Sequence, residues 1–320
     1  MQSPRPSLAF VFPGQGSQAV GMLSELASSY LEVKEVFAEA SEALSYDLWA
    51  MVQNGPEETL NLTHHTQPAM LAAGVAVWRA WRGQGGALPA VMAGHSLGEY
   101  SALVCAGVLK FEQAVRLVAE RGRLMQEAVP AGSGAMAAIL GLEDAQVVDI
   151  CERAAQDGEV VAAANFNSPG QVVLAGHTAA VERSVELARL AGAKRAVRLN
   201  VSVPSHCVLM KPAALRLAEY LRNVDFDRPQ IPVIHNADAA AHDDPDAIRD
   251  ALARQLYSPV RWVDIIRSMA AQGVTTLIEC GPGKVLVGLN KRIVKDMHAL
   301  AVYDSEGLHQ ALAREAEVSR

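Results

Sequence analysis

Short apolar runs alternate with longer amphipathic stretches along most of this chain. Compact runs at 8–12, 90–93 and 275–279 have the length and composition of buried strands. Between and after them, apolar residues recur at helical spacing. The predicted helices span residues 22–44 with a break, 67–82, 97–106, 111–128, 210–223, 245–256 and 262–272. This succession predicts a parallel sheet covered by helices, which is an α/β fold.

Residues 130–200 follow a different order. Their pattern reads strand, helix, strand, strand, helix, strand, which is a ferredoxin-like βαββαβ unit. The predicted strands span 135–140, 160–166, 171–175 and 195–201, and the helices span 143–156 and 178–190. We therefore predict a large hydrolase-like α/β domain from residues 1–129 and 201–320. A small ferredoxin-like subdomain from 130–200 is inserted into it, and the last dozen polar residues are expected to fray.

Composition and charge narrow the functional classes. The chain has 320 residues, of which 50% are hydrophobic and 20% charged, and a net charge of −7, so we expect no nucleic-acid partner. The four cysteines form no Cys-x-x-Cys pair, which argues against a zinc site or a disulfide framework. No apolar run approaches the length of a membrane span, and we expect a cytoplasmic protein.

The stretch from Gly94 to Gly98 reads Gly-x-Ser-x-Gly and lies between a predicted strand and a predicted helix. This is the context of a nucleophile elbow, in which a sharp turn exposes the serine. Ser96 is therefore the candidate nucleophile. Backbone amides at the start of the helix could stabilise negative charge that develops on a substrate oxygen.

A serine hydroxyl needs a base within hydrogen-bond reach, and the chain offers nine histidines. His206 is the candidate base, because it lies where the inserted unit returns to the larger one, and such junctions often form sites. His95, next to Ser96, should point away from the serine and pack beside the pocket. Cys207 is expected to pack rather than react.

Two further features suit acyl chemistry. A backbone amide of Gln15, in the loop after the first strand, could be a second donor to an oxyanion. A buried arginine could bind a carboxylate with its forked guanidinium. The residues alone leave Arg121 and Arg123 open for that part.

Six motifs in order resemble the malonyl-CoA:acyl carrier protein transacylases of bacterial fatty acid synthesis, over residues 8 to about 302. The motifs are Phe-Pro-Gly-Gln-Gly-Ser-Gln at 12–18, Gly-His-Ser-Leu-Gly-Glu-Tyr at 94–100, Arg-Gly-Arg-Leu-Met-Gln at 121–126, Asn-Phe-Asn-Ser-Pro-Gly-Gln at 165–171, Pro-Ser-His-Cys at 204–207 and Gln-Leu-Tyr-Ser-Pro-Val-Arg-Trp at 255–262.

The resemblance implies a role for each matching residue. Ser96 would carry the malonyl group as an ester, and His206 would be its base. Arg121 would bind the malonyl carboxylate. The backbone carbonyl of Gln255 would orient the histidine, in place of the carboxylate of a Ser-His-Asp triad.

The same resemblance assigns the remaining site residues. The backbone amides of Gln15 and Leu97 would form the oxyanion hole. Asn165 and Asn167 would face the thioester donor from the small subdomain. Apart from the resemblance, the place of His95 on the elbow predicts that it lines the site.

Partners and rival functions follow from the same reading. The implied partners are malonyl-CoA and a phosphopantetheinylated acyl carrier protein, with no metal or redox cofactor, and we expect a monomer. The candidate basic residues for docking an acidic carrier are Lys194, Arg195, Lys284, Lys291 and Arg292. The rivals are a serine thioesterase or hydrolase, a non-catalytic carrier-binding subunit, and a transacylase for another carboxyacyl-CoA such as methylmalonyl-CoA.

Overall fold

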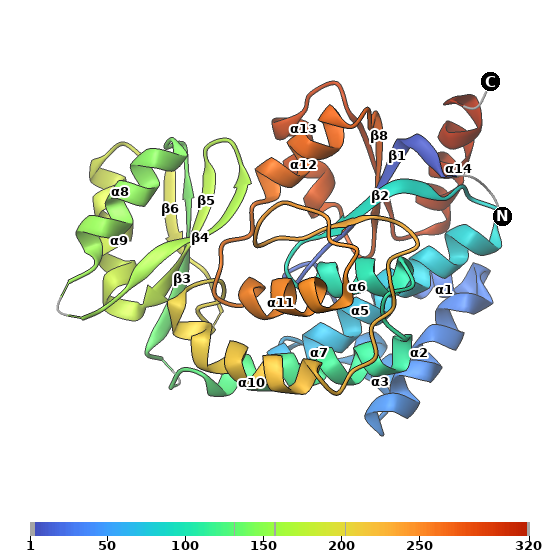
Figure 1. Cartoon of the computed structure of the whole chain (residues 1–320), viewed down its shortest axis with the longest axis horizontal. Coiled ribbons are helices and arrows are strands. Elements are labelled where there is room, and N and C mark those ends of the chain that lie inside the picture. The colour runs from blue at the N-terminus through green and yellow to red at the C-terminus, as the bar shows by residue number, and fades with distance from the viewer. Residues whose placement is uncertain (1–3, 131, 157, 202, 319–320) are drawn as a thin grey trace.

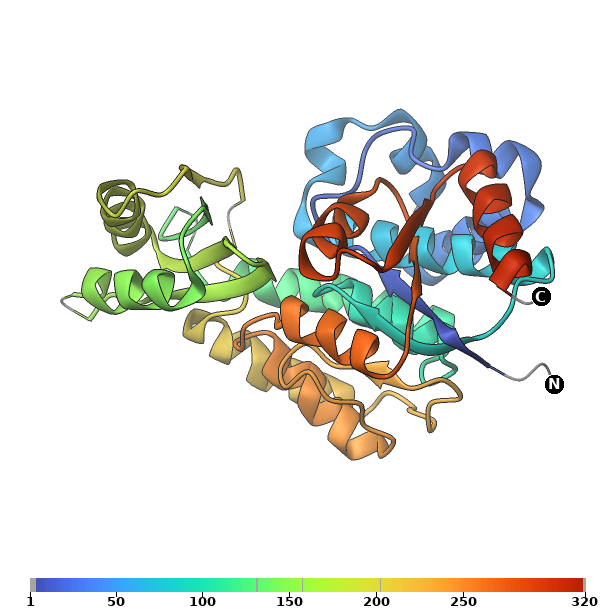
Figure 2. The same cartoon turned by 90° about the horizontal axis from the view of Figure 1, so that it is seen from above.

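Two β-sheets organise the chain, and the smaller one is built from a segment that interrupts the larger (Figure 1). The computed structural model describes residues 4–130, 132–156, 158–201 and 203–318. Figure 2 shows the small sheet and its two helices extending to one side of the larger body.

The large sheet has five strands in the order β7-β2-β1-β8-β9, and all of its pairings are parallel. Its strands are β1 (Arg5–Phe12), β2 (Pro89–Gly94), β7 (Val233–Ile234), β8 (Thr276–Cys280) and β9 (His298–Val302). Strand β1 lies at the centre of this sheet, between β2 and β8, and the apolar residues of all three strands are largely buried. The carboxyl ends of β1, β2 and β8 therefore meet at one edge, where open α/β sheets bind their ligands.

Alternate residues of these strands enter different cores because successive side chains point to opposite faces. Phe10 and Met92 join a cluster with the helices of one face, whereas Val11 and Ala93 join another cluster with Trp262. The first cluster draws on α1 (Ser24–Ser29), α2 (Leu31–Leu44), α3 (Leu48–Asn54), α4 (Glu57–Leu60), α5 (Thr63–Gly83), α6 (Gly98–Cys105), α7 (Phe111–Glu127), α10 (Lys211–Leu221), α11 (Pro245–Gln255) and α14 (Ser305–Val318). The second draws on α12 (Trp262–Ala271) and α13 (Val285–Ile293). Both faces are thus covered, as a parallel sheet requires.

The small sheet has the order β4-β5-β3-β6, and every pairing is antiparallel. Its strands are β3 (Gly134–Leu140), β4 (Val161–Ser168), β5 (Gln171–His177) and β6 (Arg195–Arg198), and its helices are α8 (Asp144–Ala154) and α9 (Thr178–Leu190). One face packs against the two helices, and the other packs against the segment that holds Cys207. The predicted ferredoxin-like order is confirmed.

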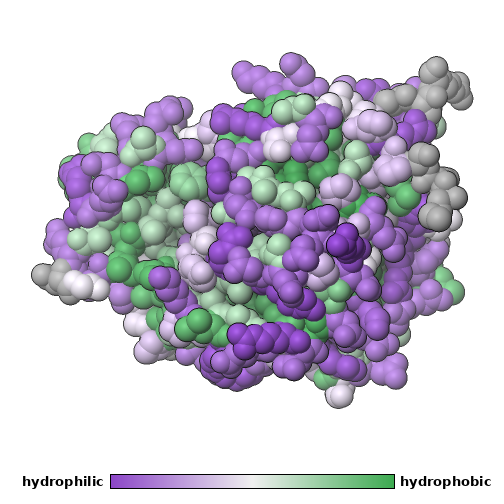
Figure 3. All heavy atoms as spheres, in the orientation of Figure 1, coloured by the Kyte–Doolittle hydropathy of each residue, from purple (hydrophilic) through white to green (hydrophobic). Residues whose placement is uncertain are grey.

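Two backbone hydrogen bonds join the small sheet to the larger unit. The amide of Phe166 in β4 donates to the carbonyl of Val260, and the amide of Val260 donates to the carbonyl of Ala164, at 3.0 and 2.8 Å. These two bonds connect the edge of the small sheet to the loop that precedes α12. Figure 3 shows apolar side chains gathered over the small sheet and its junction with the larger body, while the opposite end of this face is mainly hydrophilic.

The sequence predicted the α/β class and most of the elements, but three details differ. The polar C-terminus was expected to fray, yet α14 continues to residue 318 because Leu308 and Ala311 are buried against the main core. The predicted strand at 195–201 ends at Arg198. The short helices α3 and α4, the short strands β7 and β9 and the helix α13 were not predicted. None of the described helices is long and apolar enough to cross a bilayer.

Candidate active site

Ser96 lies in the turn between β2 and α6, which is the strand–turn–helix context that the sequence predicted. Its φ of 51° falls in the left-handed region that side-chain-bearing residues rarely adopt. A Cβ on Gly94 would lie 1.8 Å from the carbonyl carbon of Gly98, and one on Gly98 would lie 2.0 Å from the carbonyl oxygen of Phe12. The two glycines therefore allow β1, β2 and α6 to approach closely enough to force this turn.

The imidazole of His206 faces the serine from a segment 110 residues later in the chain. Its Nε2 lies 2.8 Å from Oγ of Ser96, and its Nδ1 lies 2.8 Å from the backbone carbonyl oxygen of Gln255. Because a carbonyl oxygen can only accept, Nδ1 carries the proton in this pair. In the neutral ring Nε2 is then free to accept the proton of the serine hydroxyl.

The protonation of His206 follows from its surroundings. Burial lowers the pKa of His206 to about 3, and the positive charge of Arg121 acts in the same direction. The ring is therefore neutral at pH 7, and only the neutral ring can accept a proton from the serine.

Arg121, and not Arg123, reaches the serine. Its side chain is 1% exposed, and its guanidinium donates to Oε1 of Gln67 at 2.8 Å and to Oγ of Ser96 at 3.2 Å. Among the described residues no carboxylate lies within ion-pair distance of Arg121, and its Nε has no hydrogen-bond partner. Arg123 is exposed and forms ion pairs with Glu120 and Glu127. Of the two arginines that the sequence left open, Arg121 thus lies beside Ser96 and Arg123 lies on the surface.

A cavity of about 310 Å³ opens in front of Ser96, between the large and the small sheet. All the site residues that the sequence singled out, except Gln255, line this cavity. The lining includes Gln15, His95, Ser96, Leu97, Arg121, Asn165, Asn167 and His206. Apolar side chains from both units, among them Met136 and Leu286, complete its wall. The pocket thus combines an apolar wall with a few convergent polar groups, as binding sites do.

The small sheet contributes two asparagines to this wall. Oδ1 of Asn167 accepts a hydrogen bond from Nε2 of His95 at 2.8 Å. The His95 ring also packs against Trp262, and burial lowers its pKa. Asn165 is 6% exposed and forms the bridge between β4 and Val260. His95 therefore links the elbow to the small sheet.

The backbone amides near the serine are divided between two tasks. The amide of Ser96 donates to Oδ1 of Asn236 at 2.7 Å, so it is already engaged. Leu97 lies at the N-cap of α6, and Gln15 lies across the same cavity in the loop after β1. These two residues remain the candidates for an oxyanion hole, whose donors must face the reacting carbonyl.

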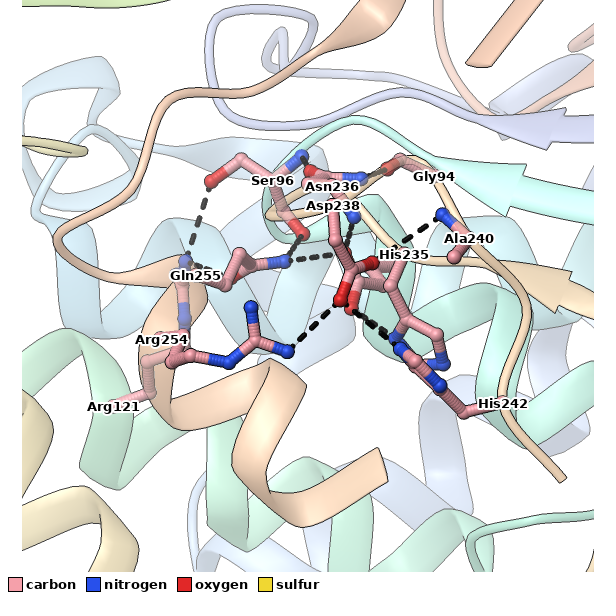
Figure 4. Close-up of polar contacts among 11 residues, drawn as sticks. Gly94, Ser96, Arg121, His235, Asn236, Asp238, Ala240, His242, Arg254 and Gln255 are labelled. Atoms are coloured by element: carbon pink, nitrogen blue, oxygen red, sulfur yellow. Dashed lines mark hydrogen bonds and ion pairs between the residues drawn. The ribbon is translucent and has the colours of Figure 1, made fainter. Parts of the chain in front are cut away.

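Sequence reasoning missed three polar side chains beside the site. The side chain of Gln255 accepts from Arg121 at 2.9 Å and donates to the carbonyl of Ser96 at 2.9 Å (Figure 4). Asn236 donates to the carbonyl of Gly94 at 2.7 Å, and Glu99 on α6 is fully buried. A lone carboxylate in the apolar helix at 97–106 was a signal for Glu99; nothing local marks Asn236.

The other candidates lie elsewhere. The Cys207 thiol donates to the carbonyl of Pro204 at 3.2 Å, and burial raises its pKa to about 11, so it is a poor nucleophile. The proposed docking residues Lys194, Arg195, Lys284, Lys291 and Arg292 are all exposed. Arg292 on α13 also donates to the side chain of Gln171 at the start of β5, 2.6 Å away. Among the residues described, no group of three or more potential ligands is placed to hold a metal ion.

Comparisons with known proteins agree with this geometry. The family model of the acyl transferase domain matches residues 9–315. The malonyl CoA-acyl carrier protein transacylase of Escherichia coli K12 is 61% identical over 304 residues, covering 95% of this chain and 98% of that protein. The Bacillus subtilis protein of the same name is 46% identical, covering 95% and 96% of the two chains.

Solved structures show the same similarity. The crystal structure of an acyl carrier protein S-malonyltransferase from Vibrio cholerae superposes with a TM-score of 0.93 at 63% identity, covering 95% of this chain and 99% of that one. A malonyl-transacylase solved in complex with a type II PKS acyl-carrier protein gives a TM-score of 0.95 at 57% identity, with 96% and 99% coverage.

Proposed function

Because this chain belongs to the family of malonyl CoA-acyl carrier protein transacylases, we propose that it moves a malonyl group from malonyl-CoA to the phosphopantetheine thiol of acyl carrier protein. The observation that carries the proposal is the meeting of three groups at one point. Oγ of Ser96 lies 2.8 Å from the imidazole of His206 and 3.2 Å from the guanidinium of Arg121.

In the first half-reaction, Oγ of Ser96 attacks the thioester carbonyl of malonyl-CoA while Nε2 of His206 takes the hydroxyl proton. The carbonyl of Gln255 holds the ring in the tautomer that this step needs and stabilises the imidazolium that forms. Collapse of the tetrahedral intermediate breaks the carbon–sulfur bond. The proton on His206 passes to the departing CoA thiolate, and malonyl-Ser96 remains.

Arg121 recognises the acyl group in this scheme. Its bond to Oγ of Ser96 puts the guanidinium within reach of any acyl group carried on that oxygen. A malonyl carboxylate would supply the anionic partner that Arg121 lacks among the described residues. The amides of Gln15 and Leu97 donate to the oxyanion, and each such donor is worth about 3 kcal/mol in comparable acyl-transfer sites.

In the second half-reaction, the carrier thiol attacks the malonyl ester. His206 takes the thiol proton and returns it to Oγ of Ser96 as the ester bond breaks. Asn165, Asn167 and His95 line the path of the thioester arm, and no metal or redox cofactor takes part. The exposed basic residues near α13 and on the small sheet are the docking candidates for the acidic carrier.

The setting of this activity is part of the proposal. We infer a monomer that works in the cytoplasm, without a membrane or nucleic-acid partner. The large domain comprises residues 1–129 and 201–320, and residues 130–200 form the small subdomain. The two units supply opposite walls of one cavity, which supports dividing the chain in this way.

Intact-mass analysis tests the proposal directly. The protein is incubated with malonyl-CoA and then with phosphopantetheinylated carrier protein. We expect one malonyl group on the protein, which disappears as the carrier gains it, and no such adduct on Ser96→Ala. Prompt release of free malonate before the carrier is added would instead indicate a hydrolase. Equal loading from methylmalonyl-CoA would indicate a broader carboxyacyl transferase.

A further inference from the structure

Glu99 is a buried carboxylate beside the site that the catalytic scheme does not use. It lies on the first turn of α6, three residues after Ser96, and is fully excluded from solvent. Burying a carboxylate is costly unless its oxygens are hydrogen-bonded. Glu99 meets this condition, because its two oxygens accept hydrogen bonds from three donors. The donors belong to Gln255 and to the neighbouring residues His235 and Asn236.

One oxygen of Glu99 serves the site itself. Its Oε2 accepts from the side-chain amide of Gln255 and from the backbone amide of Asn236, both at 2.9 Å. Its Oε1 accepts from Nδ1 of His235 at 2.7 Å. The carboxylate thereby joins α6 to the end of α11 and to the segment that follows β7.

Glu99 acts together with the Ser96 carbonyl and Arg121 to fix which way the Gln255 amide faces. A carboxylate can only accept and a guanidinium can only donate. The NH₂ group of Gln255 must therefore face Glu99, and its Oε1 must face Arg121, 2.9 Å away. Figure 4 shows the Gln255 side chain reaching from its helix toward both Ser96 and Arg121. The reversed amide would set donors against Arg121.

Asn236 connects Glu99 to the turn that holds the nucleophile. Its backbone is held by Glu99, its Oδ1 accepts from the amide of Ser96 at 2.7 Å, and its Nδ2 donates to the carbonyl of Gly94 at 2.7 Å. Asn236 therefore clamps both sides of the elbow, as Figure 4 also shows. The orientation of the clamp depends on the anchored carboxylate.

We propose that Glu99 is a positioning residue for malonyl transfer, which aims Arg121 through the side chain of Gln255 and holds the Ser96 turn through Asn236. The inference rests on the proposed function. Its distinctive consequence is selectivity. Arg121 serves only acyl groups that end in a carboxylate, so Glu99 should matter more for malonyl than for acetyl transfer.

The test is Glu99→Gln, which keeps the shape and removes the charge. A neutral amide cannot accept from all three donors at once. We expect kcat/KM for malonyl-CoA to fall by about 10- to 100-fold, the worth of a charge-assisted hydrogen bond. The fall with acetyl-CoA should be smaller, so the ratio of malonyl to acetyl loading drops. In a Gln255→Ala background the same substitution should change that ratio by less than about twofold.

Glu279→Gln is the matched control. Glu279 is also a fully buried carboxylate, but it accepts from the amides of Leu286 and Val287 on α13 and not from Gln255. This control should leave the malonyl-to-acetyl ratio unchanged. Should Glu99→Gln fail to fold, Glu99→Asp keeps the charge but shortens the reach, and it should also lower the ratio.

Three results would overturn the inference: an unchanged ratio in a folded Glu99 variant, equal loss with both donors, or additive effects in the Gln255→Ala background. The wild-type protein is assayed in parallel for malonyl transfer to the carrier. Failure of that transfer contradicts the proposed function, whereas a competent wild type with an unchanged ratio contradicts only the role of Glu99.

Discussion

Arg121 is a buried cation beside the nucleophile whose partners are neutral side chains. We expect Arg121→Ala to lower malonyl loading by about 10- to 100-fold, because a charge-assisted contact to the acyl carboxylate is lost. Loading from acetyl-CoA should be spared or raised, since acetyl has no carboxylate to bind. Single-turnover loading from the two donors measures the difference, and an equal loss with both would remove the carboxylate-binding role.

The same arginine affects the base. Its positive charge adds to burial in lowering the pKa of His206, so Arg121→Ala should raise that pKa. A base with a raised pKa becomes protonated at a higher pH, so activity is lost earlier as the solution is acidified. We predict that the acid limb of kcat/KM for acetyl-CoA moves to higher pH in the variant. An unmoved limb would mean that burial alone determines the pKa.

At the scale of elements, the elbow depends on backbone contacts that exclude any side chain. A Cβ at position 98 would lie 2.0 Å from the carbonyl oxygen of Phe12, and backbone cannot move aside as a flexible side chain can. We expect Gly98→Ala to lower the free energy of unfolding by about 1–3 kcal/mol or more, and to reduce acyl loading as Ser96 shifts. Urea denaturation measures the first effect.

Gly288→Ala is the comparison for that measurement. Gly288 is exposed on α13, and a Cβ there meets nothing within 4 Å. Alanine in a helix is favoured over glycine, so this variant should be more stable than wild type by about 0.5–1 kcal/mol. If Gly98→Ala had the same free energy of unfolding as the wild type, the elbow would tolerate a wider turn than its contacts suggest.

The elements that the sequence failed to predict share a physical cause. Strand β7 has two residues, too few for any periodicity, and it forms because β2 offers it a free edge. Helix α14 is mostly polar, and tertiary contacts hold it in place, among them the burial of Leu308 and Ala311 in the main core. By contrast, β1, β2, α7 and the whole βαββαβ unit carry their patterns locally and were predicted within a few residues.

At the scale of the molecule, the site also combines residues that local sequence could predict with contacts that it could not. Ser96 has a local signature in its glycines, and the ordered motifs indicated His206, Arg121 and Gln255. Their geometry was not predictable, because the serine and the histidine are 110 residues apart. The side chain of Asn236 accepts a hydrogen bond from the backbone amide of Ser96, yet Asn236 lies 140 residues away in a segment without a motif. Contacts of this kind exist only once the fold brings the segments together.

The two sheets enclose one cavity with one nucleophile, and this arrangement determines the order of events. In the proposed scheme both thiols, that of CoA and that of the carrier, react at Ser96, which lines the cavity between the large unit and the small sheet. The bonds that join Val260 to β4 leave the two walls connected at the site. Because one serine carries the acyl group between the two thiols in the proposed scheme, the bond to the first thiol breaks before the second thiol attacks.

This geometry predicts ping-pong kinetics. When initial rates are measured with malonyl-CoA and carrier protein both varied, double-reciprocal plots should give parallel lines, and free CoA should compete with the carrier for the acylated protein. Intersecting lines would require donor and acceptor to be bound together. A cavity that holds one thioester arm at a time would then be the wrong description of the space between the two units.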